Sequence, residues 1–424
     1  MKTNVSTPSF DLIVSLDRSD KTVAIALLDV ATGTFLDERN LSSAPEAMDA
    51  WWHELRRAQS GARIAVAFEQ PAPNLIAFFA ARRPAAIYAL NPSATFAYRN
   101  ALSVSHARND PSDARNQARF VAHAHASLRA WAPPPAKVEH LDRLTRNRRK
   151  LVNQRTGLTN RLQATLKRYY PQALDLLHEH LWRPMNLAFL RRWPQPAKLR
   201  RAPLSRLRSF YLKHNSRSEK RWQDRTAVIK DMVLLGEPNP ADELEVMVML
   251  NQIEVLNKGI ATHDRAIAEV FAAEGEPADR VAALPGAGPI FAPRLYTALV
   301  RHMPHCDGPE ALAAAVGVAP VTDQSGKMRK IYRRLRCDTF TRQTFAEWAK
   351  ESWKHSVWAE AFYRQREAKG HAFHSIMRAL AYKWVRILWR CWTDGVAYDE
   401  LKYLAQLRCK GSPLVPPEIN LNAA

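Results

Sequence analysis

Two short apolar stretches that each end in a carboxylate decide the fold: Leu12-Ile-Val-Ser-Leu-Asp17 and Ile64-Ala-Val-Ala-Phe-Glu69. Runs of this length, rich in small and branched apolar residues, are typical of buried β-strands. Asp17 and Glu69 then stand at the carboxyl ends of two strands, where neighbouring strands can bring them to one point of a sheet edge. The sequence therefore predicts a sheet with an acidic edge.

The surrounding region is predicted to be an α/β domain that ends at the proline run Pro133–Pro135. Thr22–Leu28, and residues 31–35 after a turn, would complete a hairpin meander with the first stretch. The other elements expected in this domain are the helices 47–57, 74–83 and 113–130 and the strand Ala86–Leu90.

The charge of the chain is large and uneven. The 424 residues carry a net charge of +21, yet residues 1–135 hold 14 Lys and Arg against 12 Asp and Glu. Almost all the excess lies after the first domain, which argues against an ordinary acidic metabolic enzyme and favours a polyanionic partner. Four scattered cysteines argue against a disulfide framework. No signal peptide or membrane-spanning run is expected, so the predicted setting is reduced and cytoplasmic.

Two long amphipathic helices are predicted in the middle region, 136–275. Residues 138–170 carry leucines at heptad spacing, and residues 242–271 carry apolar residues mostly three and four apart. Such helices form a coiled coil, within one chain or between chains, or belong to a plain helical bundle. The first helix is also strongly basic, and the arginines proposed there to bind nucleic acid are Arg146, Arg148 and Arg149.

Residues 183–225, between these helices, hold 13 Lys and Arg against two acids. Trp193, Phe210, Tyr211 and Trp222 are interleaved with the cations. One interpretation is a small helical module that rests on nucleic acid, mainly through phosphates. The other is a basic surface over a small aromatic core.

A second pair of carboxylates, Asp110 and Asp113, lies three residues apart at a predicted helix start, and this spacing places both on one helix face. Together with Asp17 and Glu69 they would form a set of hard oxygen ligands that suits Mg²⁺ or Mn²⁺. Such ions neutralise mutually repelling carboxylates and assist phosphodiester chemistry. Without metal, Asp110 would instead be the N-cap of the helix, with Asp113 facing its dipole.

The last region, 276–424, is predicted to be mainly helical and contains two motifs. Gly286 and Gly288, in Leu284-Pro-Gly-Ala-Gly-Pro289, precede an apolar helix and resemble the turn of helix–hairpin–helix DNA modules, which offers backbone N–H groups to a phosphate. Ser325, in Gln324-Ser-Gly-Lys327, would present its hydroxyl in a tight turn. The basic residues expected beside it to hold phosphate are Lys327, Arg329, Lys330, Arg333, Arg334 and Arg336.

With these motifs in this order, the chain resembles the DEDD transposases of bridge-RNA-guided insertion sequences, which are relatives of the Piv-type DNA invertases. The likeness covers residues 10–405. In the first domain it is carried by Asp17, Ala67-Phe-Glu69 and Arg108-Asn-Asp110-Pro-Ser-Asp113. In the last domain it is carried by Leu284-Pro-Gly-Ala-Gly-Pro-Ile290, Ala315-Val-Gly-Val-Ala-Pro320 and Gln324-Ser325-Gly326.

The resemblance implies an RNase H-like (RuvC-like) domain that holds metal with Asp17, Glu69, Asp110 and Asp113. It also implies a separate transposase domain whose serine, at Ser325, attacks DNA and forms a phosphoserine link. The implied partners are donor DNA, target DNA and a structured guide (bridge) RNA, bound by dimers that assemble into a tetramer at the bacterial nucleoid. An active site would then combine one subunit's carboxylates with another's serine.

Two other functions remain compatible with the residues themselves. One is a metal-dependent endonuclease of the Holliday-junction type, in which water is the nucleophile and Ser325 is only a turn residue. The other is a nucleic-acid-organising protein without catalysis, whose carboxylates only cap helices. A covalent protein–DNA adduct distinguishes the first function from both alternatives.

Overall fold

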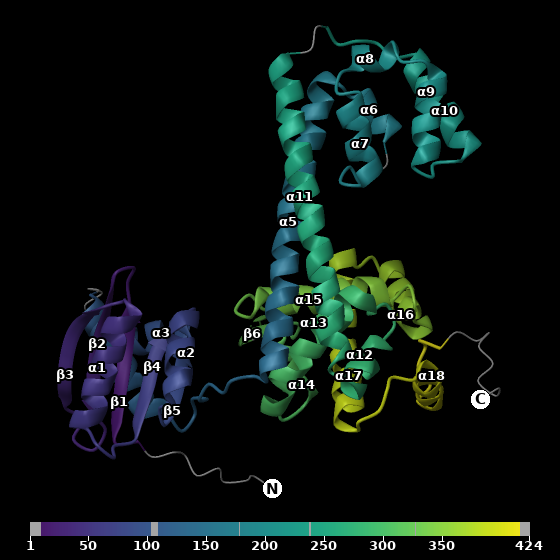
Figure 1. The fold of residues 1–424 in the computed structure, drawn as a ribbon. Coiled ribbons are helices and arrows are strands. Elements are labelled where there is room, and N and C mark those ends of the chain that lie inside the picture. Colours follow the sequence, from purple (N-terminus) through teal and green to yellow (C-terminus); the bar gives the residue numbers. More distant parts are fainter. Residues whose placement is uncertain (1–9, 103–108, 178, 237–238, 327, 416–424) are drawn as a thin grey trace. The chain divides into compact units, whose positions relative to one another are not determined.

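The computed structural model describes residues 10–102, 109–177, 179–236, 239–326 and 328–415. The chain divides into two compact units, Met1–Pro133 and Pro134–Ala424. The first is built on a mixed β-sheet and the second is mostly helical (Figure 1). The predicted α/β region followed by a mainly helical region is therefore confirmed. The finer division at residues 135 and 275 stays a prediction.

Five strands form the sheet of the first unit, in the order β3-β2-β1-β4-β5. β1, β2 and β3 form an antiparallel meander, β4 is parallel to β1, and β5 is parallel to β4. The meander and the two buried strands agree with the sequence analysis, although most of residues 31–35 is the turn into β3. The strands are β1 Leu12–Arg18, β2 Thr22–Asp29, β3 Phe35–Ser42, β4 Ile64–Glu69 and β5 Ala86–Leu90.

Helices cover both faces of this sheet because alternate strand residues point to opposite sides. Val14 and Val66 pack in the core under α1 and α2, whereas Ile13 and Ala67 pack in the core under α4. The helices are α1 Pro45–Ala58, α2 Pro73–Arg82, α3 Pro92–Leu102 and α4 Asp110–Ala124.

Two helix predictions in this unit were inaccurate. The helix expected at 113–130 begins at Asp110 and ends at Ala124. The helix α3 was not predicted, because Asn91-Pro92 was interpreted only as the end of a strand. Proline is favoured in the first turn of a helix, where its missing N–H costs no hydrogen bond, and Pro92 begins α3 in this way.

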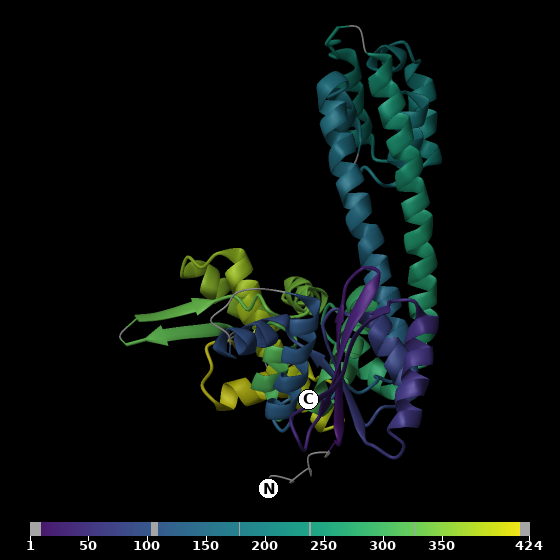
Figure 2. The ribbon, with the colours of Figure 1, turned by 90° about the vertical axis from the view of Figure 1, so that its left-hand side faces the viewer.

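The second unit contains two long helices that pair within one chain, α5 (Ala136–Tyr169) and α11 (Pro240–Ala272). They run antiparallel, since ion pairs join Arg161 to Glu245 near one end of the pair and Arg148 to Asp264 near the other (Figures 1 and 2). The structure therefore confirms the two predicted helices and makes their pairing intramolecular.

At one end of this helix pair lies a small helical module with an aromatic core. Phe189, Trp193, Phe210 and Tyr211 are buried together, and Trp222 packs against them half-buried. The small aromatic core is therefore confirmed, and binding of nucleic acid by the basic residues of the module stays a prediction. The helices are α6 Gln172–Leu176, α7 Pro184–Arg192, α8 Pro196–Arg200, α9 Leu204–Lys213 and α10 Glu219–Lys230.

The other end of the helix pair joins a helical body around Trp348, Trp358 and Trp384, which are all fully buried. A two-stranded hairpin, β6 (Val321–Ser325) and β7 (Met328–Tyr332), projects from this body (Figure 2). The four cysteines are free, as expected. The helices are α12 Glu276–Ala282, α13 Gly288–His302, the short 3-10 turn Met303–His305, α14 Pro309–Ala315, α15 Thr339–Ser352, α16 Val357–Ala368, α17 Phe373–Thr393 and α18 Glu400–Cys409.

None of the helices in the described part of the chain has the length and the apolar run needed to span a bilayer.

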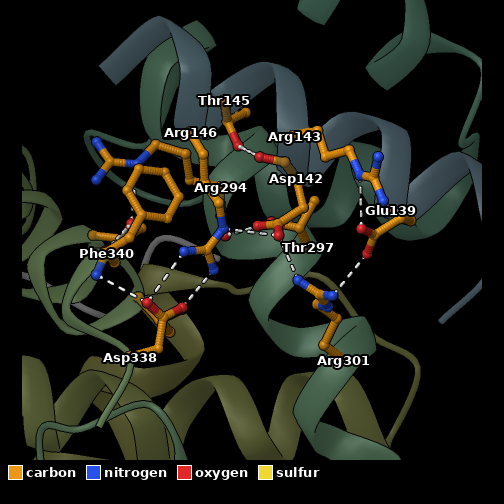
Figure 3. A network of polar contacts seen from close by, with 12 residues as sticks. Glu139, Asp142, Arg143, Thr145, Arg146, Arg294, Thr297, Arg301, Asp338 and Phe340 are labelled. Atoms are coloured by element: carbon orange, nitrogen blue, oxygen red, sulfur yellow. Dashed lines mark hydrogen bonds and ion pairs between the residues drawn. The ribbon is translucent and has the colours of Figure 1, made fainter. Parts of the chain in front are cut away.

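A network of ion pairs joins the base of α5 to the helical body (Figure 3). Asp142, which is buried, accepts hydrogen bonds from Arg146 Nε, at 2.8 Å, and from Arg301 on α13. Arg146 also donates to both oxygens of Asp338, which caps α15. Burial would raise the pKa of Asp338, but hydrogen bonds from Arg146 and Thr341 outweigh it and lower the pKa to about 2.

Three arginines that were expected to bind nucleic acid also have a role in the fold. Besides the ion pairs of Arg146, Arg148 pairs with Asp264 on α11, and Arg149 Nη2 lies 2.8 Å from Glu347 Oε1 on α15. Arg146, Arg148 and Arg149 therefore stabilise the packing of α5, and their binding of nucleic acid stays a prediction.

Asp142→Ala should lower the free energy of unfolding of the second unit by about 2 kcal/mol, because it removes one partner of a buried charge network. Arg146 and Arg301 would keep only their contacts with Asp338 and Glu139. The measurement is the denaturant midpoint of unfolding.

Asp264→Ala is the matched control. Its carboxylate is 47% exposed and pairs with Arg148 alone, so the loss should be much smaller. Equal losses in the two variants would show that the buried network does not hold α5 to the helical body.

Candidate functional site

The sheet brings two of the predicted carboxylates together at one edge. β1 and β4 are parallel neighbours in a register that pairs Leu16 with Phe68. Asp17 and Glu69 directly follow this pair, and each is the first residue of its strand that is not fully buried. The carboxyl ends of two parallel strands therefore place both carboxylates at the same edge, as the sequence predicted.

The helix α4 carries the other two carboxylates to this edge. Ser15 in β1 donates a hydrogen bond of 2.5 Å to the carbonyl of Ala114, which packs against small residues of β2. The close contact holds the first turn of α4, and with it Asp110 and Asp113, over the end of β1. Asn109 caps the helix by accepting from the Ser112 N–H at 2.8 Å. The N-cap expected at Asp110 is therefore wrong, and its carboxylate has no capping role.

The charges of the other three carboxylates act on Asp17. The pKa of Asp17 is raised to about 6, first by burial and then by the negative charges of Asp113, Asp110 and Glu69. A hydrogen bond of 3.3 Å from Gln117 Nε2 partly opposes this rise. The site thus concentrates negative charge that a cation would stabilise.

Three polar residues that the sequence analysis missed contact these carboxylates. Thr95 donates to Glu69, and Arg99 Nη1 donates to Asp113 Oδ1 at 3.0 Å. Both lie on the unpredicted helix α3, one turn apart, so recognition of Pro92 as a helix start would have placed them on one face. The third residue, Gln117, is buried, and its Oε1 has no hydrogen-bond partner.

The donor set fits a divalent cation in chemistry and charge. Carboxylate oxygens are the ligands that Mg²⁺ and Mn²⁺ prefer, and the raised pKa of Asp17 and the unpartnered Oε1 of Gln117 mark a place where a cation is favourable. Within the residues that the structure describes, no three His, Cys, Asp or Glu side chains stand close enough to hold one ion. To bind the metal, the Asp113 carboxylate would have to give up its hydrogen bond with Arg99.

Ser325 lies at the tip of the β6–β7 hairpin in the second unit. It pairs with Met328 across the turn, where Gly326 adopts a φ of +56° that favours glycine. The hydroxyl is exposed, and no described residue makes a hydrogen bond with the Ser325 side chain. The expected presentation of this hydroxyl in a tight turn is therefore observed, although the flanking strands were not predicted.

The basic residues that follow Ser325 continue along the hairpin. Arg329 and Lys330 are exposed on β7, and Arg333 and Arg336 are exposed beyond it. Arg334 is half-buried, and its Nε is buried without a partner. No described carboxylate pairs with these residues, in contrast to the arginines of α5. Lys327 lies outside the described residues.

The two glycines of the turn before α13 have different surroundings. Gly286 (φ +68°) lies against the backbone of α15, where a Cβ would come within 3.0 Å of Glu351 and Ser352. Gly288 (φ +49°) is exposed with open space around it. Close packing against α15 explains why glycine is needed at position 286. The prediction that the turn binds a phosphate rests on Gly288, which has open space around it.

Comparison with known proteins connects both halves of the chain to one family. The DEDD transposase family of IS110 matches residues 14–171, and the transposase IS116/IS110/IS902 family matches residues 278–364. The chain therefore contains two IS110-family transposase domains. A candidate mini-circle transposase for IS117 of Streptomyces coelicolor is 25% identical over 332 residues, which is 76% of this chain and 79% of the relative.

The family makes the protein a DNA transposase, and its DEDD domain indicates the use of a divalent metal. The matched segments contain the four carboxylates in the first domain and Ser325 in the second. Each of these residues lies at an exposed or half-buried position of the transposase.

The raised pKa of Asp17 predicts a pH-dependent stability. The folded pKa, about 6, exceeds the ordinary value of 3.8, so the folded state binds more protons between about pH 4 and 6. Stability should fall as pH rises through this window and level off above it. Asp17→Asn should remove this dependence and raise the melting temperature near neutral pH, as a thermal scan across the range would show.

The change in melting temperature on addition of a divalent metal is a second test of the same variant. Millimolar Mg²⁺ or Mn²⁺ at neutral pH should raise the melting temperature of the wild type and leave that of Asp17→Asn nearly unchanged, because binding to the folded state stabilises it. Asp20→Asn, an exposed carboxylate in the β1–β2 turn, is the control. If both variants respond to metal as the wild type does, Asp17 holds no metal.

Proposed function

We propose that this transposase cuts and rejoins the DNA of an insertion sequence with Ser325 as nucleophile, assisted by metal held on Asp17, Glu69, Asp110 and Asp113. The observation that carries the proposal is an exposed serine at a hairpin tip, followed by cations without carboxylate partners. A nucleophile that attacks a DNA phosphate needs this access and this positive surrounding.

The chemistry at the serine is a transesterification. Ser325 Oγ attacks the phosphorus of a phosphodiester and loses its proton, while the bond from phosphorus to one sugar oxygen breaks and that oxygen takes up a proton. The product is a phosphoserine ester, which conserves the phosphodiester energy. Attack by a sugar hydroxyl of another strand reverses these steps, rejoins DNA and restores the serine.

The carboxylates form the second part of the proposed active site. The sheet order, an antiparallel meander followed by parallel strands with acids at their carboxyl ends, supports an RNase H-like (RuvC-like) domain. Bound Mg²⁺ or Mn²⁺ would stabilise the charge that develops on the phosphate and leaving oxygen. The residues of this chain position the ion: β1 and β4 supply Asp17 and Glu69, and the first turn of α4 supplies Asp110 and Asp113.

Guide RNA and assembly complete the proposal. No described residue hydrogen-bonds to the Ser325 hydroxyl, so its proton acceptor must come from the assembled complex. We propose a dimer that assembles into a tetramer on donor and target DNA, directed by a structured guide RNA. The support is the resemblance to bridge-RNA-guided transposases and the concentration of the positive charge after residue 135.

Ser325→Ala should abolish the covalent protein–DNA adduct and recombination between donor and target plasmids. DNA affinity and melting temperature should change little, because the hydroxyl is exposed and makes no described contact. The adduct is measured by denaturing gel after incubation with labelled DNA and metal. Thr322→Ala removes an exposed hydroxyl from the other face of the same hairpin and should keep the adduct.

The outcomes separate the alternative functions. Metal-dependent DNA cleavage without an adduct, retained by Ser325→Ala, would make the protein a hydrolytic endonuclease. DNA binding with neither cleavage nor adduct would make it a nucleic-acid-organising protein. Either result would remove Ser325 from the proposed role.

A further inference from the structure

A cavity of about 560 Å³ lies at the base of the β6–β7 hairpin, between the hairpin and helices α15, α16 and α17. Its lining contains no Asp or Glu. It does contain six cations: Arg333, Arg334, Arg342, Arg366, Arg378 and Lys383. Only the first two belong to the basic run after Ser325; the other four come from helices that the sequence analysis did not connect with function.

These cations have no carboxylate partners among the described residues. Arg342 Nη1 donates to the carbonyl of Arg334 at 2.6 Å, and Arg334 Nε is buried without a partner. Arg366 and Lys383 lie near the ring of Phe362, at 4.7 Å and 5.4 Å from its centroid. Elsewhere in the unit, arginines at similar depth pair with acids, as Arg301 does with Asp142.

Burial and nearby like charges both act on Lys383, which lines the cavity. Burial, followed by the charges of Arg366 and Arg386, lowers the pKa of Lys383. Cations that repel one another in a concave surface are stabilised by an anion, and more strongly there than on an open surface. A second cavity, of about 450 Å³ beside α18, shows the contrast, since Asp394 and Asp399 accompany its cations.

The cavity and Ser325 are joined by one element, the β6–β7 hairpin. Tyr332, at the base of the hairpin, pairs with Val321, and Ser325 pairs with Met328 at its tip. Four residues of strand correspond to roughly 13 Å. Because duplex DNA advances about 3.4 Å per base pair, a strand held in the cavity reaches Ser325 after roughly four nucleotides.

We propose that this cavity binds backbone phosphates of the DNA strand that Ser325 attacks, about four nucleotides from the attacked phosphodiester. The distance from the cavity to the attacked phosphodiester rests on the proposed role of Ser325. The proposed binding of DNA phosphates in the cavity does not. Arg366, Arg378 and Lys383 then hold the strand in register with the hairpin, and the attacked phosphate is placed by contacts at both ends of β7.

The test uses two double variants of the full-length protein with the same loss of charge. Arg366→Gln with Arg378→Gln removes two cavity cations. Arg364→Gln with Arg390→Gln removes two cations from the same two helices, outside the cavity lining. The cavity variant should melt at or above the wild-type temperature, because neither cavity arginine has an ion pair to lose. The control variant loses only exposed ion pairs with Glu360, Glu367 and Asp394, so its melting temperature should fall little.

Binding of labelled random-sequence duplex DNA, and of RNA of the same length, is measured by fluorescence anisotropy at several salt concentrations. The cavity variant should bind DNA about tenfold or more weakly, with a salt slope lower by about two, since each phosphate contact contributes about 0.9. The control should keep a nearly wild-type slope. Equal DNA binding by the two variants overturns the proposal, and a loss confined to RNA assigns the cavity to RNA instead.

Ethylation interference then locates the bound phosphates. Ethylation should weaken wild-type binding, but not the cavity variant, at phosphates about four nucleotides from the adduct; a site many nucleotides away would overturn the placement. If the wild type forms no adduct, the proposed role of Ser325 fails, while the comparison of binding still decides whether the cavity holds DNA.

Discussion

The packing of α5 against the helical body of the second unit depends on the buried carboxylate of Asp142. It lies on α5 and accepts hydrogen bonds from Arg146 on the same helix and from Arg301 on α13, while Arg146 continues to Asp338 at the start of α15 (Figure 3). Three helices far apart in the sequence therefore meet through one chain of charges. Because removal of one partner leaves a buried charge without compensation, such a network specifies a single arrangement.

This network also positions the proposed chemistry. Asp338 caps α15 and directly follows the basic run that leads from the hairpin. Arg294, buried beside it, donates to Thr344 at 2.9 Å and to Glu347 at 3.3 Å, and burial lowers the pKa of Arg294 to about 10. Paired charges thus anchor α15, the helix that follows the hairpin and lines part of the cationic cavity.

Uncompensated charge is what marks the functional surfaces in both units. In the first, burial and the charges of three neighbouring carboxylates raise the pKa of Asp17 to about 6, which favours the binding of a cation. In the second, the cavity cations around Lys383 lack carboxylate partners among the described residues, which favours the binding of an anion. A divalent metal ion and a DNA phosphate are the complementary ligands that we propose for these two surfaces.

The sequence by itself determined the local elements and the order of the chemical groups. Alternating or continuous apolar runs predicted β1, β2, β4 and β5, and three- and four-residue spacing predicted α5 and α11, because these patterns reflect which face of each element is buried. Asp17 and Glu69 were identified because they end such strands. The helix α3 was missed because Pro92 fits both a strand end and a helix start.

Only the tertiary structure decided which charges are free. Arg146, Arg148 and Arg149 form a basic run, yet each has a carboxylate partner that lies far away in the sequence, at separations of 192, 116 and 198 residues. Likewise, the rings of Trp193, Phe210 and Tyr211 are packed in a core, and Arg342, Arg366 and Lys383 meet in one cavity. Pairing, burial and convergence depend on contacts between distant segments, and no local spacing in the chain records them.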